Sequence, residues 1–365
     1  MSAEKYLKYI IPFNVFGTER TKEILTVNPT DTITRQDAEE VRITIYDYND
    51  QQLFQTESKL VEDCFVLKNN NNISWVNVDG LRKKDVEVLG AHFNVHPLII
   101  EDIWSSNQRA KMDEVEGVLF CLLNMLYFNE NKNAVEQEQI SIVLGKDFVL
   151  SFQEDPNRDV FDAIREKLNL QQSKLRQKSA DYLCYSMLDL IVDNYFIVME
   201  KLGERMEQIE EDIIRKSDKR SLAKINALRK ELIILKRNIA PVRDLIASII
   251  RSESVLLQES TFKYFNDIHD HIKQAYDLSE NYRDVMLSMQ DLYIGNVNLR
   301  LNEVMKVVAI VTCVLAPATV IGGIFGMNFD VIPTSHKQWG FYSAVGLMFI
   351  IPFGMLYIFK KRGWF

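Results

Sequence analysis

The feature that most constrains this chain is an uncharged stretch near its C-terminus. Residues 307–325, VVAIVTCVLAPATVIGGIF, contain no charged side chain. About 19 residues of this kind are close to the length that a helix needs to cross the hydrocarbon core of a bilayer. Threonine, alanine, glycine and proline recur in the stretch, and small or hydroxylated residues are typical of membrane helices that pack against other helices. We therefore expect a spanning helix that faces protein or water on one side.

A second uncharged stretch, residues 341–359, follows after a short loop. Lys306 precedes the first stretch and Lys360-Lys361-Arg362 follows the second, whereas the loop 326–340 contains one lysine and one aspartate. Basic residues flank the cytoplasmic side of membrane helices. We expect a multi-pass protein of the cell (inner) membrane with both termini cytoplasmic and the loop outside. This asymmetry disfavours the alternative, a buried hairpin of a soluble protein.

The composition narrows the range of partners. A net charge of −8 argues against nucleic acid and suits a surface that meets cations, although most such acidity is simply solvated. The two apolar stretches make the lipid bilayer an expected partner. The four cysteines are far apart, which predicts neither a disulfide framework nor a zinc finger. The sequence contains no Gly-rich phosphate loop, G-x-S-x-G or H-E-x-x-H motif. We therefore do not expect an enzyme.

Residues 1–155 have the pattern of an α/β domain. Short β-branched and aromatic runs separated by turn residues indicate strands, and two amphipathic segments between them indicate helices. The helices are expected at Lys83–Phe93 and His96–Trp104. The strands are expected at Tyr6–Phe13, Val41–Tyr48, Ile73–Val78, Gly117–Phe128, Ile140–Leu144 and Phe148–Phe152.

After Pro156 the pattern becomes helical. Residues 156–259 are expected to form the helical part of the cytoplasmic domain, with helices at Val160–Leu168, Ala180–Lys216 and Ser221–Ile250. Residues 260–325 are expected to form one long stalk helix that continues into the first span. At about 1.5 Å per residue this helix would be about 100 Å long, so it would pass movement of the cytoplasmic domain to the membrane. The remaining parts are an external loop at 326–340, a second span at 341–359 and a basic cytoplasmic tail at 360–365.

One face of the stalk helix carries small and weakly polar residues into the span. At a period near 3.5 it comprises Asn302, Met305, Ala309, Thr312, Ala316, Thr319 and Gly323, with Val308 beside it. Several copies packed around an axis would line a narrow pore with this face. A stripe of small residues also serves ordinary helix–helix packing, and the spacing leaves both interpretations open.

The tripeptide Gly326-Met327-Asn328, at the outer end of the first span, resembles the signature of the CorA family of magnesium channels. The similarity covers most of the chain from about residue 80. It includes the segments Asn302–Val307, Trp339-Gly340, Tyr264–His271 and His96–Ile103. The resemblance implies a homopentamer in which the first spans line the pore and the second spans surround them. It also implies a funnel-shaped cytoplasmic domain and transport of Mg²⁺, with Co²⁺ and Ni²⁺ as further candidate ions.

The resemblance assigns roles to residues of the pore. Magnesium gives up its hydration shell reluctantly, so neutral oxygens that accept from its waters suit a filter that must also release the ion. The filter would be Gly326, Met327 and Asn328, and the outer mouth would rely on Asp330, because Thr334 replaces a glutamate common in the family. The resemblance places polar rings and an apolar constriction along the face defined above. The pore-lining residues are then Asn302, Met305, Val308, Thr312, Ala316 and Thr319.

The resemblance also implies regulation by internal magnesium. Asp102 and Asp267 match carboxylates that share an ion between neighbouring subunits, with Glu101, Asp270 and His271 beside them. Facing carboxylates repel one another without a cation, so occupied sites would keep the channel shut and empty sites would release it. The expected function is Mg²⁺ influx down the membrane potential under this control. Two alternatives stay open: a zinc transporter of the ZntB type, and a membrane metal sensor that does not conduct.

Overall fold

The computed structural model describes residues 35–67, 72–156, 158, 160–327, 332 and 337–364. The strand expected at Tyr6–Phe13 lies outside these ranges. The chain divides into two compact units. The first comprises Met1–Glu210 and Ala223–Ser288, and the second comprises Glu211–Leu222 and Met289–Phe365. The division into domains expected from the sequence stays a prediction.

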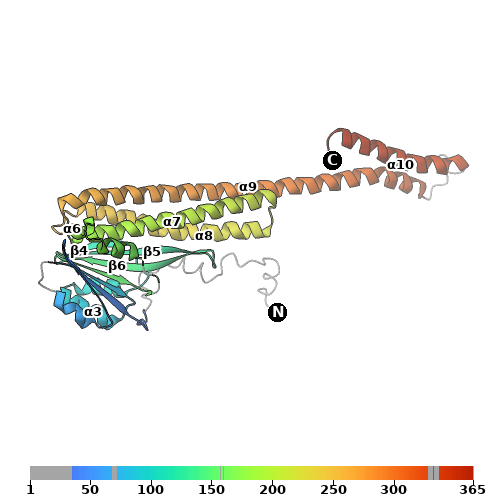
Figure 1. Cartoon of the computed structure of the whole chain (residues 1–365). Helices are drawn as coiled ribbons and strands as arrows, with labels where there is room; N and C mark the ends of the chain where they lie inside the picture. The colour runs from blue at the N-terminus through green and yellow to red at the C-terminus, as the bar shows by residue number, and fades with distance from the viewer. Residues whose placement is uncertain are drawn as a thin grey trace. The chain divides into compact units, whose positions relative to one another are not determined.

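The first unit contains a seven-stranded sheet with the order β2-β1-β3-β7-β6-β5-β4 (Figure 1). Neighbouring strands are antiparallel except for β3 and β7, which are parallel. The strands are β1 Arg42–Tyr48, β2 Leu53–Ser58, β3 Ile73–Asp79, β4 Lys111–Val115, β5 Val118–Asn129, β6 Ala134–Leu144 and β7 Phe148–Gln153.

The two edge strands, β2 and β4, are absent from the sequence-based expectation. Their sequences, LFQTES and KMDEV, are polar, and most of their residues are exposed or only partly buried. Edge strands are often kept charged because this discourages pairing with other chains, and it also removes the apolar pattern that predicts a strand. The prediction also missed the first half of β6, where Glu136 and Glu138 interrupt the apolar run.

One face of the sheet is covered by the 3₁₀ helix η1 (Val61–Leu67) and by α3 (Lys83–Phe93) and α4 (Pro97–Trp104). Buried side chains of β1, β3, β5 and β7 meet Val86 and Leu89 of α3 and Ile99 and Ile103 of α4 in one apolar core. Both helices begin and end within one residue of the ranges expected from the sequence.

The turn between α3 and α4 fixes how α4 begins. Asn94 adopts a left-handed conformation with φ 57°, and the amide of Val95 donates to the Gly90 carbonyl at 2.8 Å. The amide of Leu98 then donates to Nδ1 of His96 at 3.2 Å, so His96 caps the helix that starts at Pro97. This turn positions the acidic residues near the end of α4.

The opposite face carries the long helices α7 (Ala180–Arg215), α8 (Lys219–Arg251) and the beginning of α9 (Figure 1). The hydroxyl of Tyr195 on α7 donates to the Asn124 carbonyl of β5 at 2.5 Å, and the Asn124 side chain donates to Asn238 on α8 at 2.8 Å. The short helices α5 (Asp162–Asn169) and α6 (Lys174–Gln177) lead into α7, and α6 was not expected from the sequence.

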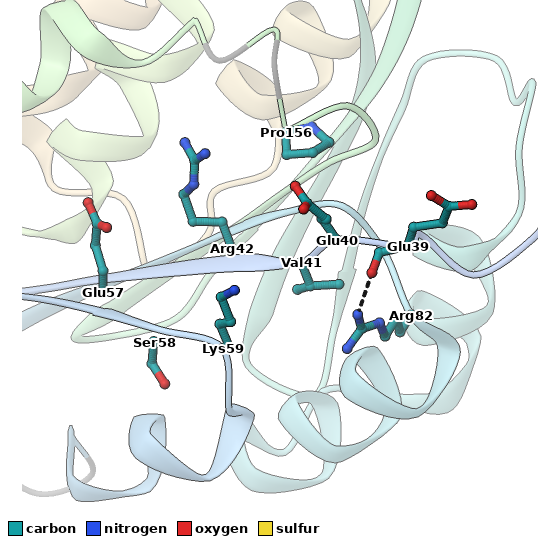
Figure 2. Close-up of a pocket in the computed structure, with 9 residues that line it drawn as sticks. All are labelled: Glu39, Glu40, Val41, Arg42, Glu57, Ser58, Lys59, Arg82 and Pro156. Atoms are coloured by element: carbon teal, nitrogen blue, oxygen red, sulfur yellow. Dashed lines mark hydrogen bonds between the residues drawn. The ribbon is translucent and has the colours of Figure 1, made fainter.

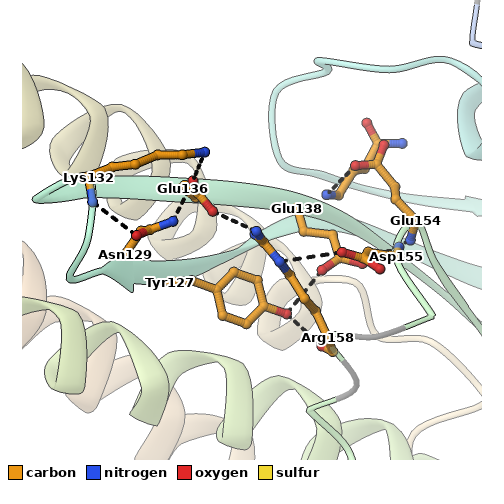
Figure 3. A network of polar contacts seen from close by, with 9 residues as sticks. Tyr127, Asn129, Lys132, Glu136, Glu138, Glu154, Asp155 and Arg158 are labelled. Carbon is orange, nitrogen blue, oxygen red and sulfur yellow. Dashed lines mark hydrogen bonds and ion pairs between the residues drawn. The ribbon is translucent and has the colours of Figure 1, made fainter.

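A polar network, drawn in Figure 3, joins β5, β6 and the segment after β7. The carboxylate of Glu138 accepts the amides of Glu154 and Asp155, each at 2.9 Å, and lies 3.0 Å from the Tyr127 hydroxyl. Burial raises the pKa of Glu138 to about 7, although these hydrogen bonds lower it. Glu138 therefore keeps its proton to higher pH than a solvated glutamate.

The pKa of the neighbouring Glu136 is shifted in the opposite direction. The hydrogen bond from Lys132 (2.8 Å), together with those from Arg158 (2.6 Å) and Asn129 (3.0 Å), lowers its pKa to about 2. Two glutamates two residues apart on β6 thus differ in protonation because one has cationic partners and the other is mainly desolvated.

The helix α9 (Glu259–Phe325) is 67 residues long and belongs to both units, with the change near residue 288. This confirms the expectation of a single helix from residue 260 to residue 325. In the second unit the Asn296 and Arg300 side chains donate to the carbonyls of Ile213 and Ser217 at 3.1 and 3.2 Å. The last helix, α10 (Gln338–Lys361), runs antiparallel to the end of α9, since Nζ of Lys306 donates to the Gly363 carbonyl at 3.3 Å.

Among the described residues, three helices are long and apolar enough to cross a bilayer, namely α7, α9 and α10. In α7 56% of the apolar stretch is buried inside the protein, whereas the corresponding values are 0% in α9 and 6% in α10. The apolar surface of α7 is therefore used by the core of the first unit. The apolar helices α9 and α10 fit membrane spans, in agreement with the expectation of two C-terminal spans.

Candidate functional site

Among the described residues, the C-terminal part of α9 packs against its own chain with one face only. Partly buried residues recur every three or four positions, which marks the side that α10 covers. These residues are Lys306, Ile310, Val314, Pro317, Ala318 and Ile321. Gly322 belongs to the same region, since a side chain there would approach Met348 of α10 to 3.7 Å.

The candidate pore residues are all exposed in the single chain. At 3.6 residues per turn, those from Met305 to Thr319 lie on the side of α9 opposite the covered stripe, and Asn302 lies between the two sides. Met305 and Val308 are 60% and 59% exposed. Within the part of the chain that the structure describes, the candidate pore face thus has no partner, as either a pore or a packing stripe between copies requires.

The hydroxyl groups of the threonines on this face donate hydrogen bonds to backbone carbonyls of the same helix. The Thr312 hydroxyl donates to the Val308 carbonyl at 2.8 Å, and the Thr319 hydroxyl donates to the Leu315 carbonyl at 3.1 Å. Their oxygens keep lone pairs for an external donor such as a water molecule. The face is weakly polar and carries no charge.

The end of α9 leads directly into the candidate filter. The amide of Gly326 donates to the Gly322 carbonyl at 3.0 Å, and the amide of Met327 donates to the Ile324 carbonyl at 3.3 Å. Gly326 and Met327 therefore form a turn that directly follows the last residue of α9, Phe325. Asn328 and Asp330 lie outside the described residues, so their assigned roles stay predictions.

Asp102 lies at the end of α4 and contacts residues of its own chain. Its Oδ2 is 2.6 Å from Nζ of Lys111 on β4, and its Oδ1 accepts from Gln108 at 3.0 Å. Burial lowers the pKa of Lys111, but the hydrogen bond and charge of Asp102 outweigh this and raise it above its ordinary value. The neighbouring Glu101 is exposed.

One flank of α9 faces the core and carries the buried residues Phe265, Ile268 and Ile272. The other flank carries Asp267, Asp270 and His271. Asp267 and Asp270 are exposed and His271 is partly buried. Among the described contacts nothing joins Asp102 to Asp267 within one chain: Asp102 pairs with Lys111, and the charge of Asp267 acts on Asp189 of α7.

The structure brings His271 together with two aspartates of α7 that the sequence interpretation missed. Ligand atoms of Asp189, Asp193 and His271 all lie within 4.8 Å of one another. Asp189 and Asp193 are four residues apart and so share one face of α7, as Asp267 and His271 do on α9. This i, i+4 spacing in both helices was the sequence signal that could have revealed the cluster. It was overlooked because the apolar stripe of α7 determined how that helix was interpreted.

The donor set fits a divalent cation. Nδ1 of His271 is buried without a hydrogen-bond partner and lies 3.9 Å from Oδ1 of Asp193. Burial and the negative charge of Asp193 raise the pKa of Asp189, with a further contribution from Asp267, against a hydrogen bond from Tyr185. A cation would relieve this repulsion, and carboxylate oxygens with an imidazole nitrogen are suitable ligands.

A cavity of about 520 Å³ lies at one end of β1 and β2 and contains none of these residues (Figure 2). Acidic and basic side chains line it in equal number, and Arg82 already donates to the Glu39 carbonyl at 2.8 Å. The cavity is separate from the carboxylates of α4, α7 and α9.

Comparison with known proteins gives consistent matches. A family model described as "CorA-like Mg2+ transporter protein" matches residues 70–361. The cobalt/magnesium transport protein CorA of Thermotoga maritima is 34% identical over 89% of this chain and 93% of its own length.

Two solved structures have the same fold. The complete CorA magnesium transporter of Methanocaldococcus jannaschii aligns with a TM-score of 0.74 at 20% identity, over 88% of this chain and 98% of that one. The ZntB cytoplasmic domain of Vibrio parahaemolyticus aligns with a TM-score of 0.51 at 19% identity, over 70% of this chain and 98% of that one. At this identity the resemblance to ZntB concerns the fold alone.

Proposed function

The chain belongs to the CorA-like Mg²⁺ transporter family, a family of membrane ion transporters and not of enzymes, and from this premise we propose that it is a magnesium channel. Cobalt is a second candidate ion, because the Thermotoga relative is named a cobalt/magnesium transport protein. Magnesium would enter down the membrane potential, which contributes about 2.3 kcal/mol per charge per 100 mV. Nickel is the third candidate ion.

The observation that carries the proposal is the unpartnered face of α9. An uncharged, weakly polar face that is exposed in one chain and backed by α10 on the other side suits helices that surround an axis. Five copies, as a homopentamer, would line a pore with Asn302, Met305, Thr312 and the neighbouring positions of the face. Met305 and Val308 would form an apolar constriction that closes by excluding water.

The filter would stand at the outer end of this pore. Gly326 offers a backbone carbonyl at a position without a side chain, and Asn328 offers an amide oxygen. Neutral oxygens can hold the waters of a hydrated magnesium ion without removing them, which allows the ion to leave. Asp330 would attract cations to the outer mouth.

Two groups of carboxylates would hold regulatory ions. Asp102 of one subunit would face Asp267 of its neighbour, with Glu101 and Asp270 nearby, and Asp189, Asp193 and His271 would add a second set of ligands. A bound cation supplies charge neutralisation at both places. Without it, the repulsion between carboxylates would favour separation of the subunits and movement of α9, which is continuous from Glu259 to Phe325.

Substitution at the filter tests the proposal. Magnesium flux into liposomes should fall strongly in Asn328→Ala, because the amide oxygen would be lost. The control Phe349→Leu changes an exposed residue of α10 and should leave the flux unchanged. Undiminished flux in Asn328→Ala would refute the filter assignment.

A further inference from the structure

The regulatory carboxylate Asp102 already has a cation from its own chain. Nζ of Lys111 is 2.6 Å from Oδ2 of Asp102, and the two side chains are only 35% and 20% exposed. Gln108 donates to the other oxygen at 3.0 Å. The negative charge that a regulatory ion requires is therefore largely neutralised in the single chain.

Lys111 has a second carboxylate within reach. Its Nζ is 3.4 Å from Oδ2 of Asp113, the residue two positions later on the same face of β4. The next acidic residue, Glu114, accepts from the Ser254 hydroxyl at 2.7 Å instead. A small movement of the ammonium toward Asp113 would free Asp102 without leaving the lysine unpaired.

No other cation is placed to replace Lys111 at Asp102 among the described contacts. The basic side chain nearest in sequence, Arg109, pairs with Asp244 on α8 at 3.4 Å. On α4 the neighbouring charge is that of Glu101, which is exposed and acidic. The competition at Asp102 is therefore between one lysine and any ion that arrives from solution.

We propose that Lys111 is a tethered competitor for the regulatory cation at Asp102, and that it sets the Mg²⁺ concentration at which the channel closes. The inference rests on the regulatory role proposed for Asp102. A divalent ion that approaches Asp102 meets the positive charge of Lys111, so binding requires the ammonium to move to Asp113. Closure then needs more magnesium than an unoccupied carboxylate would need.

The expected effect of Lys111 on Mg²⁺ binding follows from the exposure of the ion pair between Lys111 and Asp102. Partly exposed ion pairs change an equilibrium by a factor of about two to five. Lys111→Gln should therefore lower, by about this factor, the internal Mg²⁺ concentration that halves the flux into liposomes. Isothermal titration of the full-length protein with Mg²⁺ should show the same tightening.

Two variants serve as controls. Lys111→Arg keeps the charge and should behave like the parent protein. Lys83→Gln removes an exposed lysine from α3, 3.9 Å from Glu87, and should leave both measurements unchanged. An unchanged or higher half-closing concentration in Lys111→Gln would overturn the inference.

Asp102→Asn separates this inference from the proposed function. If Asp102→Asn leaves the inhibition by internal Mg²⁺ intact, the regulatory role of Asp102 is wrong. If Asp102→Asn relieves the inhibition and Lys111→Gln causes no shift, only the role of Lys111 is wrong. In the double variant Lys111→Gln should add nothing to Asp102→Asn, because the competition needs both partners.

Discussion

The helices α7 and α9 each contain a stretch apolar enough to cross a membrane, that of α9 being the more apolar, and they use these stretches in opposite ways. Both contain a stretch apolar enough for a span, but 56% of that stretch is buried inside the protein in α7 and 0% in α9. Packing within the first unit accounts for the difference: on α7 the Tyr195 hydroxyl donates to β5, and the Met199 carbonyl accepts from Tyr282 of α9. Hydropathy shows whether a helix is apolar enough to cross a bilayer, but packing decides whether its apolar face is covered by the protein.

Leucine truncation should produce the largest contrast between α7 and the apolar C-terminal helices, α9 and α10. Leu188 on α7 is fully buried and Leu347 on α10 is 49% exposed. Leu188→Ala should lower the free energy of unfolding by about 2–5 kcal/mol, because it removes buried methyl groups and leaves a cavity. Leu347→Ala should change it by less than about 0.5 kcal/mol, as is usual for surface positions.

Thermal unfolding of the full chain in the same detergent measures both variants. Equal losses of stability in Leu188→Ala and Leu347→Ala would contradict the comparison. They would mean that the exposed face of α10 is covered by protein in the assembly.

The pH dependence of stability should come from the first unit. Glu138 has a raised pKa and therefore holds its proton more tightly in the folded protein than in the unfolded chain. Its contribution to stability is present below the ordinary pKa of 4.5 and is lost as the pH rises through about 7. The loss is up to about 3 kcal/mol. Glu138→Gln should therefore flatten the decline of stability between these pH values.

Glu136 provides the matched control on the same strand. Its lowered pKa means that its contribution is present above pH 4.5 and is lost as the pH falls toward about 2. Glu136→Gln should change stability in the acid range and leave the slope between pH 4.5 and 7 intact. Chemical denaturation at several pH values distinguishes the two, and identical profiles for both variants would contradict the assignment.

Removal of a hydroxyl group from Tyr195 on α7 or from Tyr342 on α10 should give the smallest contrast in stability. Tyr195→Phe removes the hydroxyl that donates to the Asn124 carbonyl and should cost about 1–2 kcal/mol. Tyr342 on α10 is 76% exposed, and Tyr342→Phe should have no measurable effect on unfolding. A loss in Tyr342→Phe comparable to that in Tyr195→Phe would show that its hydroxyl has a partner in the assembly.

The sequence was informative wherever a local pattern had one dominant cause. The apolar runs of β1, β3, β5 and β7, the amphipathic segment His96–Trp104 and the unbroken helical pattern up to Phe325 predicted elements that the structure contains. The edge strands β2 and β4 were missed because their polar residues serve to keep an edge from pairing.

The candidate sites were predicted less completely for a different reason. Asp189 and Asp193 acquire meaning only when α7 packs beside α9 and His271 comes near, which is a long-range contact. Lys111 likewise becomes a partner of Asp102 only through the position of β4 at the sheet edge. Contacts between copies of the chain depend on an assembly that one sequence does not encode locally.

Magnesium uptake by the purified protein tests the central claim most directly. Liposomes that contain the full chain and a magnesium-sensitive dye are compared with empty liposomes at a fixed inside-negative potential. The uncharged face of α9 predicts Mg²⁺ uptake that grows with the potential and falls when internal Mg²⁺ accumulates. Uptake no greater than in empty liposomes would contradict the claim that this face lines a conducting pore.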